Sequence, residues 1–147
     1  VFALILSGSY MVGYGAGSSC ETWPLCRGSL IPDGMAYAVH MGHRYLAAAV
    51  GLIVAGAAVA AWRRRTSRPA LGQIALLIVA MLGIQTMMGA ATVWAEFSTE
   101  TRAAHLGGAT LLWTAVVALA TVLYVPRGLG LRTRVARPIA QSRGIGR

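Results

Sequence analysis

Charged residues are scarce in this chain, and acidic residues are the scarcest. Only 12% of the 147 residues are charged and only four are acidic, whereas 56% are hydrophobic. This composition excludes an ordinary soluble domain and predicts one small integral membrane protein. The net charge of +9 does not indicate nucleic-acid binding, because the arginines are confined to a few segments beside apolar runs.

Cysteine is also rare, and the two that are present, Cys20 and Cys26, do not form a Cys-x-x-Cys motif. Two cysteines alone make a poor zinc site, which normally needs four ligands. A thiol–disulfide oxidoreductase of the quinone-linked, four-helix kind would need a second cysteine pair, so the sequence disfavours this function. The sequence also lacks a nucleotide-binding glycine motif, a nucleophile elbow and a paired-carboxylate site.

Four apolar runs make up most of the sequence, and polar or turn residues separate them. They cover residues 1 to about 15, 35–62, 71–95 and 103–125. They predict an all-α fold, an up-down-up-down transmembrane bundle of four helices within residues 1–126, and a basic cytoplasmic tail over residues 127–147. The first run spans only about 22 Å of a hydrocarbon core roughly 30 Å thick. We therefore expect its helix to begin earlier, in a longer chain.

The charged residues predict the orientation of the bundle. Most arginines lie between the second and third runs and after the fourth, whereas all four acidic residues lie in the other two connections. By the positive-inside rule, both termini are cytoplasmic, and residues 18–33 and 96–102 face the outside. We expect a multi-pass protein of the inner (plasma) membrane, in contact with the lipid bilayer. Oxidising conditions outside favour a disulfide between Cys20 and Cys26, which would contribute about 2 kcal/mol.

Three histidines are the candidate functional residues, because ionisable side chains at bilayer depth are costly and usually face a bundle interior. His40 and His43 lie in the second run, with Arg44 beside them, and His105 lies early in the fourth run. The second and fourth helices are expected to be parallel and diagonal across the core. His43 and His105 would then meet as the two axial ligands of a haem iron. The alternative is that each histidine only hydrogen-bonds to a neighbouring helix.

The sequence leaves the roles of His40 and Arg44 open. His40 lies about one turn nearer the outer surface than His43. It is a second ligand, a proton carrier near neutral pH, or an interfacial residue without chemistry. Arg44 either neutralises a haem propionate or pairs with a backbone carbonyl or the membrane interface.

Four motifs occur in order along the chain. They are GYGAGSSCETWPLCRGSLIP over residues 13–32, then His43 with Arg44, then Gln85 followed by GAATV over residues 89–93, and finally Ala104-His105-Leu106. Together they cover roughly residues 8 to 125 and resemble one four-helix half of haem A synthase. The resemblance is specific because the cysteine loop and two histidines agree with it at the same time.

The resemblance implies an enzyme, an oxidoreductase of haem A biosynthesis. Haem A synthases oxidise a methyl group of haem O to a formyl group and supply haem A to terminal oxidases. Their two similar four-helix halves hold a haem b cofactor and the substrate haem O, each with a pair of histidines. The resemblance therefore implies that His43 and His105 are the axial ligands here, and that Cys20 and Cys26 form the outer disulfide.

A carboxylate one turn before the second-helix histidine is associated with the catalytic half of this family, and His40 stands there instead. We take His40 as the candidate catalytic residue, a neutral base that accepts a proton. The expected partners are haem O or haem b, haem O synthase, and a second four-helix half or another copy of this chain. Two alternative functions are a non-enzymatic four-helix b-type cytochrome that carries electrons and a haem-free helper in oxidase assembly.

Overall fold

The computed structural model describes residues 1–124, and the predicted basic tail over residues 127–147 lies outside the described residues. The order of elements is α1 (Phe2–Gly13), the short 3₁₀-helix η1 (Gly17–Ser19), α2 (Met35–Trp62), α3 (Pro69–Trp94) and α4 (Thr99–Tyr124). Within the described range, the extended backbone pairs only in an isolated bridge between Cys26 and Ser29. The predicted all-α class is confirmed.

Three of the helices are long and apolar enough to cross a membrane. The most apolar 18-residue stretches of α2, α3 and α4 have mean hydropathies of 2.0, 2.1 and 1.9. A helix of 26 residues, such as α3, extends about 39 Å, which exceeds a hydrocarbon core of roughly 30 Å. The helix α1 is apolar but has only 12 residues. The chain is therefore a multi-pass membrane protein.

Helices α3 and α4 begin earlier than predicted, because of the residues at their first turns. Pro69 opens α3, where its missing N–H costs nothing. Ser98 Oγ accepts the N–H of Thr101 at 3.3 Å, so α4 begins at Thr99 and not at residue 103. As a result, Glu100 lies in the first turn of α4. The prediction that Glu100 lies in a connection is therefore wrong.

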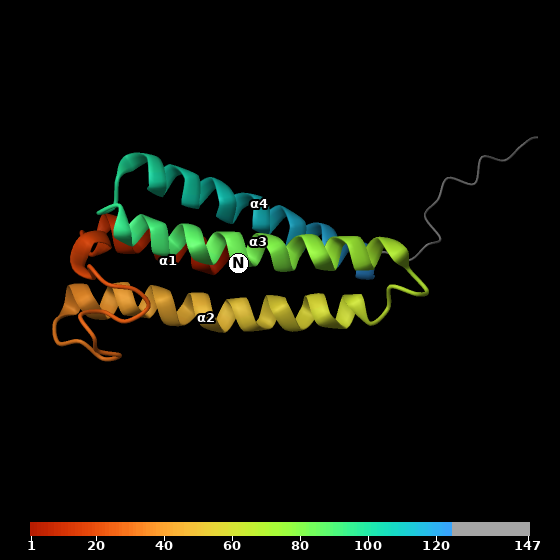
Figure 1. Cartoon of the computed structure of the whole chain (residues 1–147), viewed down its shortest axis with the longest axis horizontal. Helices are drawn as coiled ribbons and strands as arrows, with labels where there is room; N and C mark the ends of the chain where they lie inside the picture. The colour runs from red at the N-terminus through yellow and green to blue at the C-terminus, as the bar shows by residue number, and fades with distance from the viewer. Residues whose placement is uncertain (125–147) are drawn as a thin grey trace, which may run out of the picture.

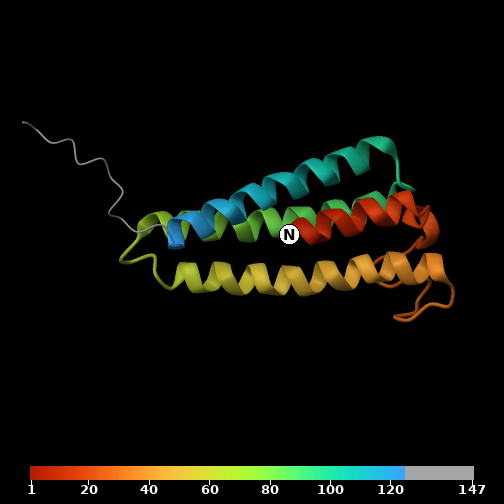
Figure 2. The same ribbon diagram turned by 180° about the vertical axis from the view of Figure 1, so that it is seen from behind.

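The ribbon views show how the four helices are arranged. In Figures 1 and 2, α2 and α4 lie on opposite sides of the molecule, and α1 and α3 lie between them, one in front and one behind. In Figure 1, α1 and α3 run towards the end that carries the loop over residues 14–34, and α2 and α4 run away from it. Both α1 and α3 pack against α2 and α4. Helices α2 and α4 therefore face each other diagonally.

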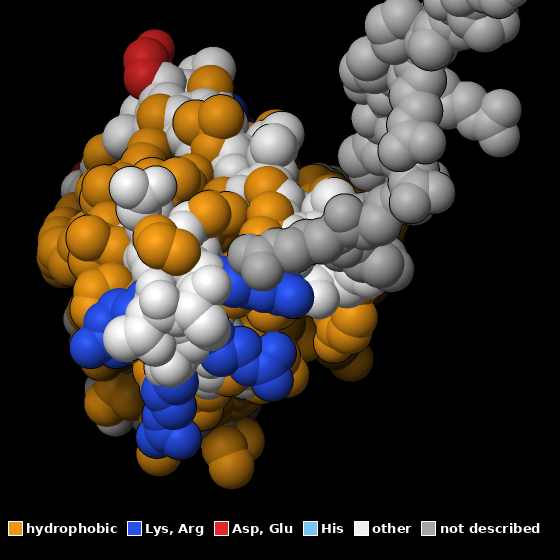
Figure 3. Space-filling view, turned by 90° about the vertical axis from the view of Figure 1, so that its right-hand side faces the viewer, with side chains coloured by type: hydrophobic (Ala, Val, Ile, Leu, Met, Phe, Trp, Pro, Cys, Tyr) orange, Lys and Arg blue, Asp and Glu red, His pale blue; other side chains and the backbone are white. Residues whose placement is uncertain are grey.

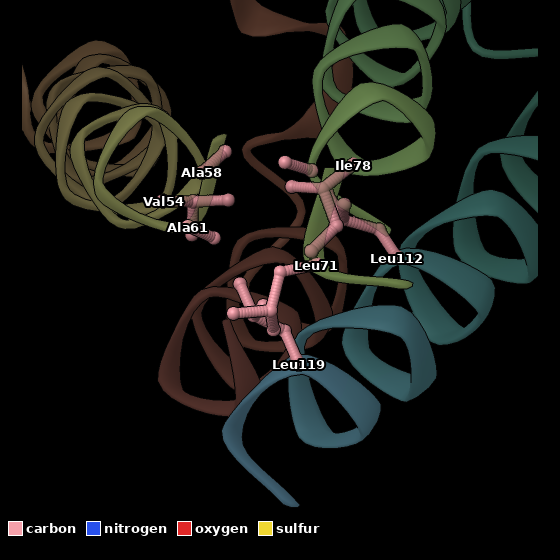
Figure 4. Close-up of a cluster of buried hydrophobic side chains, with 8 residues drawn as sticks. Val54, Ala58, Ala61, Leu71, Ile78, Leu112 and Leu119 are labelled. Atoms are coloured by element: carbon pink, nitrogen blue, oxygen red, sulfur yellow. The ribbon is translucent and has the colours of Figure 1, made fainter. Parts of the chain in front are cut away.

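The main hydrophobic core occupies the half of the bundle that is distant from this loop. Its buried residues are Val54, Ala58, Ala61, Leu71, Ala75, Ile78, Leu112 and Leu119. Figure 4 shows that α2 contributes a valine and two alanines, while α3 and α4 contribute leucine and isoleucine. Small side chains allow close approach of helices in a membrane, where burial against lipid tails alone gives little driving force. A second cluster, of Cys20, Cys26 and Met41, lies at the loop end.

The outer surface of the bundle is strongly apolar. Leu52, Ile53 and Leu76 are 75%, 71% and 62% exposed, as expected for side chains that face lipid. Figure 3 shows the end of the bundle at the α2–α3 connection, where arginine side chains project among apolar ones. The connection carries Arg63, Arg64, Arg65 and Arg68. The two ends of the bundle therefore differ in charge.

Candidate functional site

His43 of α2 is held by residues of α1. Ser7 Oγ is 2.8 Å from His43 Nδ1 and donates its own proton to Leu4 O at 2.8 Å. Because the hydroxyl proton is used in this way, Ser7 Oγ accepts the Nδ1–H of His43. Gly8 lies against the ring, and a Cβ there would be 3.1 Å from His43 Cε1. These contacts orient the imidazole and leave a lone pair on Nε2.

His105 of α4 is held in a similar way by residues of α3. Gln85 Nε2 is 3.1 Å from His105 Nδ1 and donates to the backbone oxygen of His105 at 2.8 Å. Gly89 lies against the ring, and a Cβ there would be 3.2 Å from His105 Cε1. A larger residue than glycine at position 89 would therefore displace the imidazole.

The environments of His43 and His105 match each other. Each histidine lies on the second helix of a pair, rests on a glycine of the first helix and is hydrogen-bonded at Nδ1 by a polar side chain of that helix. The bundle thus presents two imidazoles in matching surroundings on the diagonal helices α2 and α4.

His40 has a different environment and is 2% exposed. Its Nδ1 is 3.1 Å from Ala16 O, its Nε2 is 3.1 Å from Arg44 Nη2, and its ring stands edge-on to Phe97. A carbonyl only accepts and a guanidinium only donates, so Nδ1 carries the proton and Nε2 the lone pair. The ring is therefore neutral, with both nitrogens occupied, and it joins α2 to the segment before η1.

Arg44 extends this network to the disulfide loop. Its Nη1 donates to Thr22 O at 2.8 Å and to Pro24 O at 2.9 Å. Both carbonyls lie inside the ring that Cys20 and Cys26 close, and the two sulfur atoms are 2.07 Å apart, at disulfide distance. The guanidinium thus holds the loop against the end of the bundle. The contact of Arg44 with a haem propionate stays a prediction.

The donor set at His43 and His105 fits a haem iron better than a bare metal ion. Within residues 1–124, no three His, Cys, Asp or Glu side chains come together as an ion site. A haem iron receives four ligands from its macrocycle and needs only one or two from the protein. Imidazoles are ligands that such an iron takes, and these two are held at Nδ1, each against a glycine that leaves its ring room.

Comparison with known proteins identifies the family. Residues 34–144 match the family described as cytochrome oxidase assembly protein, and curated haem A synthases are among the similar sequences. The chain belongs to the haem A synthase family. It is 31% identical to the haem A synthase of Shouchella clausii over 127 residues, which covers 84% of this chain and 42% of that protein. For the haem A synthase of Maricaulis maris, the identity is 33% over 133 residues, with coverages of 82% and 38%.

Another relative carries a different name. The chain is 35% identical over 130 residues to the protoheme IX farnesyltransferase of Halobacterium salinarum, which covers 87% of this chain and 29% of that protein. This chain thus spans less than half the length of each of these three relatives. No solved structure is significantly similar to it.

In this haem A synthase family member, the residues that hold the two histidines were not predictable from the sequence. Ser7 gave no signal, because a serine in a membrane helix usually bonds only to a backbone carbonyl of its own helix, as Ser9 does to Ile5 O. Gln85 appeared only as part of a motif, and nothing linked it to His105. A polar residue in an apolar run is the available signal, but its partner depends on how neighbouring helices are aligned.

Proposed function

We propose that this chain is a four-helix half of a haem A synthase and that it binds a haem between His43 and His105. The observation that carries the proposal is the matched environment of the two imidazoles, each oriented from Nδ1 and each resting on a glycine. Histidines in such a setting are typical metal ligands, since a group that holds Nδ1 sets the tautomer and the ring plane. Membership of the haem A synthase family supports the same ligand.

In this proposal, the protein takes part in the oxidation of a methyl group of haem O to the formyl group of haem A. When bound between His43 and His105, a haem would supply a path for the electrons that leave the methyl group. The chain's own residues bind and orient that haem. Ser7 and Gln85 hold the imidazoles, the apolar helices keep bulk water from them, and Arg44 holds the loop over residues 20–26 against this end of the bundle.

We favour a haem b cofactor over the substrate haem O for this half. His40 stands where the catalytic half of the family has a carboxylate, and it is neutral with both nitrogens hydrogen-bonded. To act as the proton-accepting base that we predicted, His40 would have to lose its bond to Arg44. Haem O would then be oxidised in a second four-helix half, either of a longer protein or of another chain.

The charge distribution supports an orientation in the inner (plasma) membrane. The arginines of the α2–α3 connection lie at one end of the bundle (Figure 3), and the disulfide loop lies at the other (Figure 1). By the positive-inside rule, we propose that the arginine end, where α4 also ends, is cytoplasmic and that the disulfide loop is outside. The Halobacterium salinarum relative is by name a protoheme IX farnesyltransferase, which supports haem O synthase as a partner.

The test is to purify the full chain in mild detergent after expression with added haem b. Oxidised and reduced spectra and the pyridine haemochrome are recorded for the wild type and for His43→Ala and His105→Ala. His40→Gln is the matched control, because it changes a histidine of the same helix that has both nitrogens occupied. We expect a low-spin, bis-histidine haem in the wild type and the control, and its loss in both alanine variants.

Pigment extraction separates the enzyme from its alternatives. Cells that make haem O and express the chain together with a second half of a haem A synthase should accumulate haem A. A low-spin haem without any haem A under these conditions would favour the b-type cytochrome. A wild type that stays colourless after haem supplementation would refute the haem site and favour the haem-free assembly helper.

A further inference from the structure

In the side-chain amide of Gln85, the nitrogen has hydrogen-bond partners and the oxygen has none. Its Nε2 faces two acceptors, His105 Nδ1 at 3.1 Å and His105 O at 2.8 Å. Its Oε1 is the one buried side-chain polar atom without a hydrogen-bond partner in the described part of the chain. Leaving a buried acceptor unsatisfied costs about 1–3 kcal/mol, so the arrangement of this amide requires a reason.

A turn of the amide that brings Oε1 beside His105 Nδ1 would give the oxygen a partner, and it would break the bond that Nε2 now donates to His105 O. Because the amide nitrogen of Gln85 faces His105 Nδ1 and donates to it, Nδ1 is the acceptor and His105 carries its proton on its own Nε2. A histidine that binds iron through Nε2 needs the other tautomer, with its proton on Nδ1. When the amide turns, Oε1 accepts that proton from Nδ1, and the side chain must also shift away from His105 O, because two oxygens cannot hydrogen-bond to each other. The turned amide therefore selects the tautomer that binds a metal.

The space around the amide depends on a glycine of α4. A Cβ at Gly108 would collide with Gln85 Oε1 and would lie 3.5 Å from Met88 Sδ. Any larger residue at position 108 would occupy the volume in which the amide oxygen now lies. Gly108 thus keeps open the space that the amide oxygen occupies.

The other histidine needs no such change. Ser7 Oγ gives its proton to Leu4 O and so already accepts the Nδ1–H of His43. His43 is therefore in the metal-binding tautomer before any ligand arrives, whereas His105 is not. The two imidazoles have matching surroundings but differ in tautomer, and only that of His43 leaves Nε2 free to bind a metal.

We propose that Gln85 is a positioning residue for His105, and that its amide turns so that Oε1 receives the Nδ1 proton when His105 Nε2 binds a haem iron. This inference rests on the proposed function, because it takes His105 as an axial ligand. It gives the two bonds to iron an order, in which His43 binds first and His105 follows when the amide turns. It also makes Gln85 a determinant of how strongly His105 donates to the iron.

The test compares the midpoint potential and spin state of the full chain loaded with haem b for the wild type, Gln85→Glu and Gln85→Leu. Glutamate presents an oxygen to Nδ1 whichever way it turns, so His105 donates more strongly and the potential falls below the wild-type value. Leucine accepts no proton, so the bond to iron weakens, the potential rises and part of the haem becomes high-spin. Gln73→Leu is the matched control, because it makes the same change at an exposed position of α3.

Potentials that rise in the order glutamate, wild type, leucine, with high-spin haem only in the leucine variant, support the proposal. Equal potentials and spectra in all three proteins would overturn it, as would shifts in the same direction for both variants, which a merely structural role would produce. If Gln85→Leu does not fold, Gln85→Glu decides alone, because its shape is close to that of glutamine. The proposed function fails in a different way, when His105→Ala keeps the low-spin spectrum, and that result removes the basis of this inference too.

Discussion

Replacing Arg44 with lysine should release the disulfide loop and leave the two candidate iron ligands in place. The guanidinium donates to Thr22 O at 2.8 Å, to Pro24 O at 2.9 Å and to His40 Nε2 at 3.1 Å. A lysine ammonium is a single donor centre and cannot reach all three acceptors at once. Only the bonds to Thr22 O and Pro24 O reach the loop, because His40 lies on α2 with Arg44. A hydrogen bond contributes about 1 kcal/mol and lysine can keep one of the two, so we expect a loss of about 1–2 kcal/mol. The loop should then open roughly 5 to 30 times more often.

Amide hydrogen exchange measures this opening directly. The N–H of Arg27 is bonded to Thr22 Oγ1 at 2.9 Å, and the N–H of Cys26 is bonded to Ser29 O at 3.2 Å. Peptides over residues 20–31 of the full chain, kept non-reducing in detergent, should therefore exchange faster in Arg44→Lys by about the same factor. Arg102→Lys is the matched control, because it makes the same change at an exposed arginine that bonds to Thr99 Oγ1 of its own helix.

Two results would refute this reasoning. Unchanged exchange over residues 20–31 in Arg44→Lys would show that the guanidinium does not hold the loop. Unchanged exchange together with a lower haem content would show that Arg44 acts on the haem, as the predicted propionate contact requires. Faster exchange with an unchanged haem spectrum would confirm the loop-holding role.

Three further predictions concern packing and covalent structure. Replacing both Cys20 and Cys26 with serine should lower the thermal unfolding midpoint, because a short covalent ring contributes about 2 kcal/mol by constraining the unfolded chain, and an unchanged midpoint would contradict this. Gly89→Val should remove the low-spin haem spectrum, because even a Cβ there lies 3.2 Å from His105 Cε1, whereas Gly56→Val, where a Cβ meets nothing within 4 Å, should keep it. Leu71→Ala should lower the free energy of unfolding by about 2 kcal/mol through the cavity that it leaves. Denaturant titration of the purified protein measures this loss, and an unchanged free energy of unfolding would contradict the prediction.

The helices were largely predictable because their boundaries depend on local chemistry. Helix α2 has the predicted bounds, since an apolar run begins after Gly34 and ends before a run of arginines. The predicted start of α4 was wrong, because the prediction relied on hydropathy. Hydropathy does not indicate that polar residues such as Thr99 can begin a helix when Ser98 caps it. Apolar runs locate the membrane-crossing part of a helix but not the polar turn that precedes it.

The candidate site was predictable only in part. His43 and His105 stood out because ionisable residues are rare in apolar runs, and their role as ligands stays a prediction. The partners of these residues were not predictable, because they depend on how separate helices and loops are aligned. Ser7 lies 36 residues before His43, and Ala16 lies 24 residues before His40. Only the folded bundle brings such pairs to hydrogen-bond distance.

The diagonal placement of α2 and α4 has a mechanical consequence. These two helices face each other across α1 and α3, and each packs mainly against those intervening neighbours. An iron held between His43 and His105 would therefore connect the two diagonal helices directly. It would link the α1–α2 hairpin to the α3–α4 hairpin. Loss of the haem should therefore weaken the packing between the two hairpins more than the packing within each hairpin. The bundle would then be clamped by the same molecule that it carries.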